Sequence, residues 1–102
     1  MKKIVVSEVV GRKISSRTDG KLFRQKLLEM MKKEKRIVLD FTGLEIASVS
    51  FLDEAFGRLT DEFSLEELKD RLAFENMDDG DRKLLNFVIL SRYKEKEKLA
   101  SL

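Results

Sequence analysis

Apolar residues gather in short runs at five places along the chain, and these runs predict strands. Residues 3–10 and 36–41 are rich in β-branched side chains, and 72–75 places Leu and Phe on alternate positions. The run at 36–41 is apolar on both faces, as in a strand buried in the middle of a sheet. Two shorter extended pieces are expected at 13–15 and 44–46. Each follows a predicted turn, at Gly11–Arg12 and at Thr42–Gly43.

Between these runs, apolar residues recur every three or four positions, which is the spacing of one helix face. We expect a first helix over 16–34, capped by Ser16 or Thr18, and a second one that begins at Ser50 with Asp53 at the capping-box position. Its apolar face would contain Leu52, Ala55, Phe56, Leu59 and Phe63. The capping-box pair Ser64 and Glu67 opens a short helix, and Asp78 and Asp79 can cap a last one.

Strands and helices that alternate in this way predict an α/β fold. We expect one domain over residues 1–102, with a mixed β-sheet of about four strands and helices packed against it. The apolar stretch from Phe87 to Leu90, together with Met77, suits either the core or a contact surface for another protein. Core is the more common outcome in so small a domain.

The central strand leads into the loop that offers most for function. Ligands usually meet an open α/β sheet at the C-terminal ends of its strands, where the 42–50 loop is expected. Free N–H groups at Ser16–Arg17 and at 47–50 could bind an anion or a partner's carboxylate, with Arg17 as a bidentate donor. Helix capping by the same serines explains their positions equally well.

Three short motifs carry a resemblance to a known family. Ser16–Arg17 opens the first helix, Leu39–Asp40–Phe41 forms the central strand, and 50–54 reads SFLDE at the start of the second helix. This order resembles the STAS fold of anti-sigma factor antagonists, and more closely the STAS-like domain family of unknown function. The resemblance runs from about Gly11 to the last helix.

The resemblance implies a non-enzymatic regulatory module of bacterial signalling type. It would bind a protein partner, such as a histidine-kinase-like ATPase or a regulator, through the loop before the second helix and the exposed face of that helix. The predicted partner-binding residues are Ser16, Arg17, Ser48, Val49, Ser50, Asp53, Glu54 and Arg58. Anti-sigma factor antagonists carry a phosphorylatable serine in an Asp-Ser-Ser-Gly loop at this place. Here the phosphosite falls on or beside Val49, which leaves Ser48 and Ser50 as candidate phosphoacceptors.

Composition narrows the choice of function. Lys and Arg number 21 against 19 Asp and Glu, and a net charge of +2 gives no reason to expect nucleic acid. A nucleic-acid accessory role for the lysines near 32–36 is therefore a third choice. The chain has no Cys and no His, which removes thiolate chemistry and the commonest general base and metal ligand. We expect no cofactor, no metal, no membrane span and a cytoplasmic protein, and leave a homodimer open.

One acidic cluster and one single aspartate could each serve either a chemical or a structural role. Asp78, Asp79 and Asp81 could hold a divalent cation, but an EF-hand register would place Met77 and Asn86 at ligand positions, so capping is preferred. Asp40 ends a buried strand and is expected to anchor the following loop. The alternative function is a small phosphate-handling enzyme, in which Asp40, Asp53 and Arg17 converge in one pocket.

Overall fold

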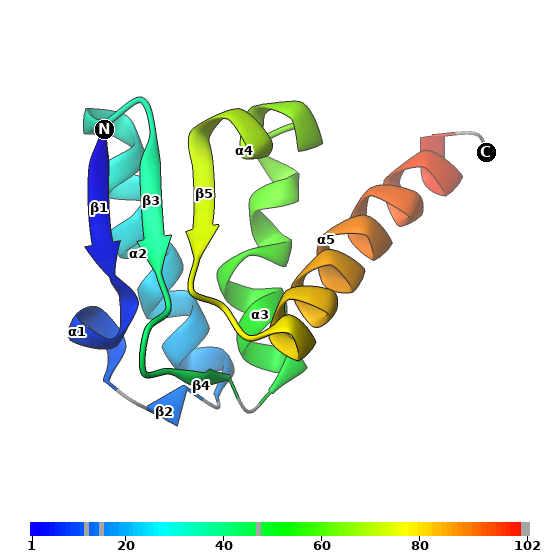
Figure 1. Ribbon diagram of the computed structural model, residues 1–102. Coiled ribbons are helices and arrows are strands. Elements are labelled where there is room, and N and C mark those ends of the chain that lie inside the picture. The colour runs from blue at the N-terminus through cyan, green and yellow to red at the C-terminus, as the bar shows by residue number, and fades with distance from the viewer. Residues whose placement is uncertain (12, 15, 47, 101–102) are drawn as a thin grey trace.

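The computed structural model describes residues 1–11, 13–14, 16–46 and 48–100, and Figure 1 shows how their helices and strands are arranged. The strands are β1 (Lys2–Val5), β2 (Lys13–Ile14), β3 (Ile37–Asp40), β4 (Glu45–Ile46) and β5 (Leu72–Glu75). The helices are α1 (Val6–Val10), α2 (Arg17–Lys33), α3 (Val49–Ala55), the 3₁₀ helix η1 (Gly57–Asp61), α4 (Leu65–Arg71) and α5 (Asp79–Ala100). Ser15 and Ala47, which belong to predicted segments, lie outside the described residues.

The main sheet has three strands in the order β1-β3-β5, and all of them are parallel. Leu39 of the central strand lies beside Ile4 on one side and Phe74 on the other. The predicted α/β architecture is present, but a mixed sheet of about four strands is not confirmed, since the main sheet of the described residues has three strands and all are parallel. The short pieces β2 and β4 pair with each other, also in parallel, and form a separate two-stranded sheet.

The N-terminal strand is shorter than its β-branched sequence predicts. Residues 3–10 were expected to be extended, but β1 ends at Val5, opposite the last residue of β3. Residues 6–10 pair with no strand in the part of the chain that the structure describes, and their backbone forms α1 instead. The Gly11 N–H donates to the Ser7 carbonyl at 2.9 Å, and Gly11 ends the helix with φ +82°. Loss of the pairing partner thus overrides β propensity.

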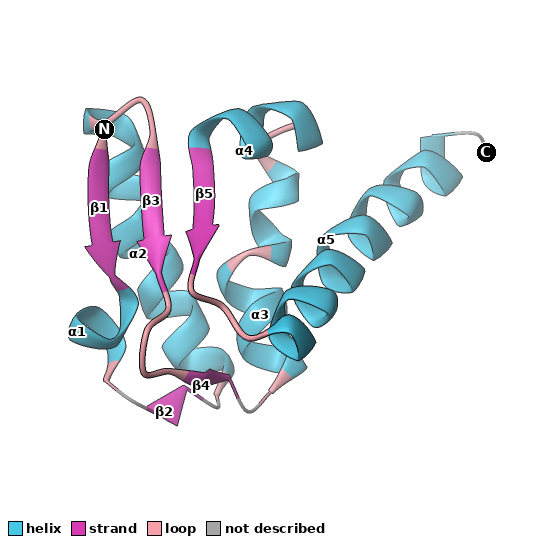
Figure 2. Ribbon diagram, in the orientation of Figure 1, coloured by secondary structure: helices cyan, strands magenta, loops and turns pink. Residues whose placement is uncertain are grey.

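In Figure 2, α2 lies behind β1 and β3, and α3 lies to the right of β5, between α2 and α5. Between them and the sheet is a core rich in phenylalanine. The ring of Phe56 is fully buried at the centre, 5.6 Å from the ring of Phe23 and 5.2 Å from that of Phe74, measured between centroids. Helix α5 begins near the C-terminal end of β5 and runs outward from it (Figure 1). None of the described helices has the length and apolar character that a bilayer crossing requires.

The second predicted helix is divided into two parts. Its buried face is confirmed, since Leu52, Ala55 and Phe56 are inaccessible to solvent. However, α3 ends at Ala55 and the chain continues as η1. A Cβ at Gly57 would lie 2.6 Å from an Asp53 carboxylate oxygen and 3.0 Å from the Val88 side chain, so glycine leaves room at this point for the Asp53 carboxylate and for α5.

Three of the four predicted helix N-caps are confirmed. Ser16 caps α2, and Ser64 forms the predicted capping box with Glu67 on α4. Asp78 accepts a hydrogen bond from the Gly80 N–H at 3.0 Å, at the start of α5. The cap of α3 is Ser48 instead of Ser50, so the capping box predicted between Ser50 and Asp53 is wrong.

Candidate functional site

The predicted site residues at the starts of α2 and α3 lie beside α5, which the sequence did not place there. Between these helices is a shallow depression of about 410 Å³, here called the α3–α5 depression. It is lined by Arg17, Val49, Asp53, Phe87, Val88, Ser91, Arg92 and Glu95. Three of the predicted residues, Arg17, Val49 and Asp53, therefore share one surface.

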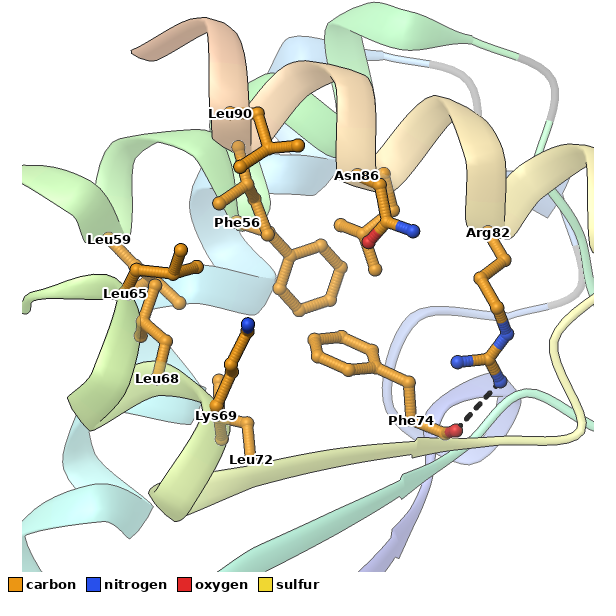
Figure 3. Close-up of a pocket in the computed structure, with 12 residues that line it drawn as sticks. Phe56, Leu59, Leu65, Leu68, Lys69, Leu72, Phe74, Arg82, Asn86 and Leu90 are labelled. Carbon is orange, nitrogen blue, oxygen red and sulfur yellow. Dashed lines mark hydrogen bonds between the residues drawn. The ribbon is translucent and has the colours of Figure 1, made fainter. Parts of the chain in front are cut away.

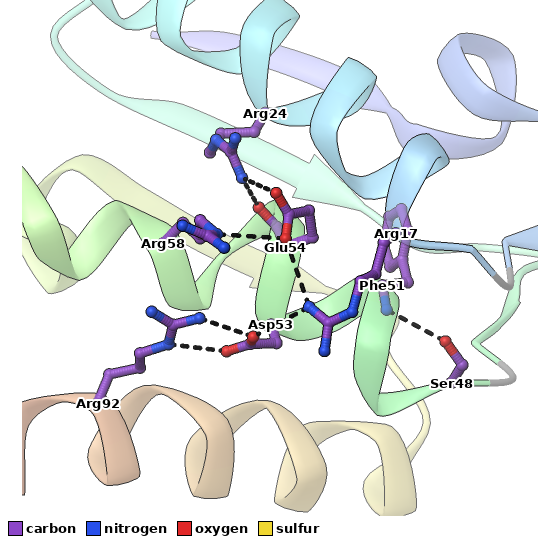
Figure 4. Close-up of polar contacts among 8 residues, drawn as sticks. All are labelled: Arg17, Arg24, Ser48, Phe51, Asp53, Glu54, Arg58 and Arg92. Carbon is purple, nitrogen blue, oxygen red and sulfur yellow. Dashed lines mark hydrogen bonds and ion pairs between the residues drawn. The ribbon is translucent and has the colours of Figure 1, made fainter. Parts of the chain in front are cut away.

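Asp53 joins α3 to α5 through a bidentate ion pair, shown in Figure 4. The Arg92 guanidinium donates from Nε at 2.8 Å and from Nη2 at 2.7 Å to the two oxygens of the Asp53 carboxylate. Arg17 donates to the same carboxylate at 3.4 Å. The hydrogen bond from Arg92 is the main reason that the pKa of Asp53 lies below its ordinary value, against the opposing effect of burial.

Glu54 was predicted to contact a partner, but only 10% of its side chain is exposed. Its side chain is buried and lies among three arginines, at 3.1 Å from Arg24, 3.2 Å from Arg58 and 3.4 Å from Arg17 (Figure 4). Arg24 also donates to the Glu54 backbone carbonyl. Burial raises the pKa of Glu54, but the hydrogen bonds from Arg24 and Arg58 outweigh this effect and bring the pKa below its ordinary value.

The close approach of α2 to α3 explains why Glu54 is buried. A Cβ at Gly20 of α2 would lie 2.9 Å from the Glu54 Cβ and 2.9 Å from the Phe51 carbonyl oxygen. Glycine therefore allows α2 to pass directly over α3, and this covers Glu54. Arg58 lies in η1 and is not among the residues that line the α3–α5 depression.

The serines of the predicted site act mainly as caps in this structure. Ser16 accepts a hydrogen bond from the Asp19 N–H at 3.1 Å, and Ser48 accepts one from the Phe51 N–H at 3.1 Å. Ser16, Ser48 and Ser50 are all partly exposed, so the loop reaches the surface. Val49 follows the cap, and 47% of its side chain is exposed.

Asp40 is a loop anchor, as the sequence predicts. One of its oxygens accepts hydrogen bonds from the Thr42 N–H at 2.9 Å, the Thr42 hydroxyl at 2.6 Å and the Asn76 amide at 3.0 Å. The Thr42 hydroxyl contributes most to lowering the pKa of Asp40 to about 2, followed by the Asn76 amide. Asn76 has φ +56°, a left-handed conformation that asparagine tolerates and that this bond helps to hold.

The alternative phosphate-handling pocket would need Arg17, Asp53 and Asp40 together. The structure brings Arg17 within 3.4 Å of Asp53. Asp40 does not line the α3–α5 depression, and its hydrogen bonds go to Thr42 and Asn76 instead. Across the described ranges, no group of acidic side chains is arranged to hold a metal ion, and this includes Asp78 and Asp79.

Comparison with protein families agrees with this architecture. Residues 19–82, more than half of the chain, match the family described as STAS-like domain of unknown function. The chain belongs to this family. No curated protein and no solved structure matches it. The matched segment of this STAS-like domain includes the three-residue strand motif at 39–41 and all of α3, and it ends within the first turn of α5.

The sequence did not identify the residues that α5 contributes to the depression of this STAS-like domain. The stretch from Phe87 to Leu90 was expected to be either core or a contact surface for another protein, and the structure divides it between core and exposed surface. Val88 is buried, whereas Phe87 is 66% exposed and Leu90 is 45% exposed. A weak signal was present, because Phe87 lies off the helix face defined by Leu85, Val88 and Arg92. Nothing in the sequence indicated that Arg92 would pair with Asp53.

Proposed function

We propose that this STAS-like domain is a non-enzymatic regulatory module that binds a protein partner at the α3–α5 depression. The proposal is supported mainly by two exposed apolar side chains on opposite walls of this depression. Phe87 projects from α5 and Val49 from the first turn of α3. Exposed aromatic side chains next to cations are typical of the residues that dominate binding energy at protein interfaces.

Arg17 supplies the cation at this surface. Its side chain is 59% exposed although it lies 3.4 Å from both Asp53 and Glu54. A guanidinium held in this way can still present N–H groups to a carboxylate of the partner. We therefore propose that the partner contributes an apolar side chain between Phe87 and Val49, and an acidic side chain that approaches Arg17.

The surroundings of the depression support binding more than catalysis. The carboxylates of Asp53 and Glu54 are paired with arginines, and their pKa values lie below the ordinary range. A general acid or base at neutral pH requires the opposite shift. The bidentate Asp53–Arg92 pair fixes α5 against α3, so the two apolar side chains are held in place before a partner arrives.

The resemblance to anti-sigma factor antagonists makes a histidine-kinase-like ATPase the first partner to test. We would chemically cross-link the tagged protein in its native cells and identify its partners by mass spectrometry. The affinity of the purified partner would then be compared for the wild type and for Phe87→Ala, with an expected loss of about tenfold or more. Arg17→Met should weaken binding less and make it less dependent on salt.

Leu99→Ala is the matched control, because Leu99 is also an exposed apolar residue of α5 but does not line the depression. It should bind the partner as the wild type does. The proposal would be wrong if Phe87→Ala and Arg17→Met, both with unchanged circular dichroism, bound the partner with wild-type affinity.

A further inference from the structure

A second hollow lies on the other side of α5, enclosed by η1, α4, β5 and α5. Figure 3 shows the side chains that line it, and its volume is about 510 Å³. We call it the β5–α5 groove. Its size is within the range of roughly 300–1,000 Å³ that is usual for small-molecule sites. It shares no lining residue with the α3–α5 depression.

The lining of the groove is apolar with a few basic or neutral polar groups. Nine of its residues are hydrophobic: Phe56, Leu59, Leu65, Leu68, Leu72, Phe74, Leu85, Ile89 and Leu90. The polar ones are Lys69, Arg82 and Asn86, and no acidic residue is among them. The groove is therefore suited to a molecule with a long apolar part and a negative charge.

The polar groups face the same space. In Figure 3, the Lys69 side chain points from α4 into the groove, and the Asn86 amide points into it from α5. Among the residues that the structure describes, neither side chain has a hydrogen-bond or ion-pair partner. Unpaired donors beside an apolar wall give a charged ligand a defined orientation.

Arg82 makes a protein strand a poor occupant of this groove. β5 is the edge strand of the main sheet, and an extended peptide would add to it through its outward backbone groups. The outward carbonyl of Phe74 already accepts a hydrogen bond from Arg82 at 2.9 Å. This contact covers the strand edge and holds the Arg82 guanidinium against it, at the lining of the groove.

We propose that the β5–α5 groove binds a small amphipathic carboxylate with an unbranched alkyl chain of medium length. The alkyl chain lies along the leucines of α4 and α5. The carboxylate lies between Lys69 and Arg82 and accepts a hydrogen bond from the Asn86 amide. This site is separate from the proposed partner surface, so either proposal can fail without the other.

Isothermal titration calorimetry with sodium decanoate tests the proposal. Decanoate should bind with one site per chain, and decylammonium chloride should bind at least tenfold more weakly, because it places a cation beside Lys69 and Arg82. Lys69→Met should weaken decanoate binding about fivefold and leave the binding of decanol unchanged. Lys83→Met, which removes a lysine of α5 that does not line the groove, should leave decanoate binding unchanged.

A second pair of variants tests the position of the site. Leu90→Glu places a negative charge at the groove, on a side chain that is already 45% exposed, and should reduce decanoate affinity about tenfold. Leu99→Glu makes the same change at an exposed position away from the groove and should not affect it. Equal binding of decanoate and decylammonium, no detectable decanoate binding to the folded protein, or equal effects of the two glutamates would overturn the proposal.

Discussion

The two sides of α3 are held in place by different kinds of interaction. One side packs into the hydrophobic core, where Phe51, Leu52 and the C-cap residue Phe56 are fully buried. The other side faces α2 and α5 through Asp53 and Glu54, which are surrounded by arginines. One helix of seven residues thus allows a comparison of apolar packing with ion pairing in the same protein.

The two sides differ in what they contribute. Apolar packing stabilises roughly in proportion to the area removed from water and has little directional preference. Ion pairs that are partly buried contribute less net stability, because desolvation offsets much of the attraction. Unlike apolar contacts, however, the ion pairs form in only one relative position of the helices. We infer that the apolar side of α3 provides most of the stability, and that the charged side fixes where α2 and α5 lie against it.

The largest effect expected from this comparison is on the apolar side. Phe56→Ala removes a ring that is fully buried and lies 5.2 to 6.4 Å from the rings of Phe23, Phe51, Phe41 and Phe74. We expect the free energy of unfolding to fall by about 3–5 kcal/mol, the usual cost of such a cavity. Unfolding in urea, followed by circular dichroism, measures it. Phe87→Ala is the control and should change stability by about 0.5 kcal/mol or less, since that ring is mostly exposed.

The next largest effect is expected where α2 crosses α3. Gly20→Ala would ordinarily stabilise a helix by about 1 kcal/mol. Here the new methyl group would lie 2.9 Å from the Phe51 carbonyl and from the Glu54 Cβ, so α2 must move away. We expect a net loss of about 1–3 kcal/mol in the free energy of unfolding.

Gly80→Ala is the comparison for this prediction, because the nearest atom to its new methyl group is the end of the Asp78 side chain, at 3.1 Å. It should be neutral or should stabilise the protein. If Gly20→Ala stabilised the protein as much as Gly80→Ala, the close approach of α2 to α3 would be wrong.

Local patterns predicted the apolar side of α3 correctly and the charged side poorly. The buried face of Leu52, Ala55 and Phe56 follows from their spacing, and the capping box at Ser64 follows from four consecutive residues. By contrast, Glu54 was predicted to contact a partner, although its side chain is buried. Its burial depends on Gly20, which is 34 positions away and gives no local sign of contact with α3.

The sheet was mispredicted for a similar reason. The strands predicted at 36–41 and 72–75 are local features, and the structure has strands at 37–40 and 72–75. Whether β2 and β4 join the main sheet, and where β1 ends, depends on which strands become neighbours. That information lies in contacts between distant segments and is weak in a single sequence. The same limit applies to the α3–α5 depression, because Arg92 reaches Asp53 across 39 positions.

A smaller effect on stability is expected from the ion pair between Asp53 of α3 and Arg92 of α5. Arg92→Met keeps most of the side-chain length but removes both hydrogen bonds to Asp53. The Arg92 side chain is 25% exposed and the Asp53 side chain 21% exposed. Solvent screening therefore limits the expected loss in the free energy of unfolding to about 1 kcal/mol. Lys94→Met on the same helix is the control and should be neutral.

Hydrogen exchange gives this prediction a second measurement. If the ion pair fixes α5, backbone amides of α5 should exchange faster in Arg92→Met, while those of β3 should keep their protection. Unchanged exchange in α5 would mean that apolar contacts alone, such as those of Val88, hold this helix.

The last effect concerns Asp40 and is the most specific one, because it depends on pH. The pKa of its carboxyl is about 2 in the folded protein, against 3.8 as its ordinary value. The unfolded chain therefore binds a proton more readily, and the contribution of Asp40 to stability is present above about pH 5 and is lost as the pH falls toward 2.

Asp40→Asn keeps the oxygen that accepts all three hydrogen bonds but cannot be protonated in this range. Urea unfolding from pH 7 to pH 2 should show a shallower acid limb for Asp40→Asn, because the variant already lacks at pH 7 the stability that the wild type loses on acidification, so the two curves converge near pH 2. Asp53 and Glu54, whose pKa values are also lowered, should keep part of that limb. Asp70→Asn, at an exposed position, should leave the curve unchanged, and an equal change in the two variants would contradict the anchoring role of Asp40.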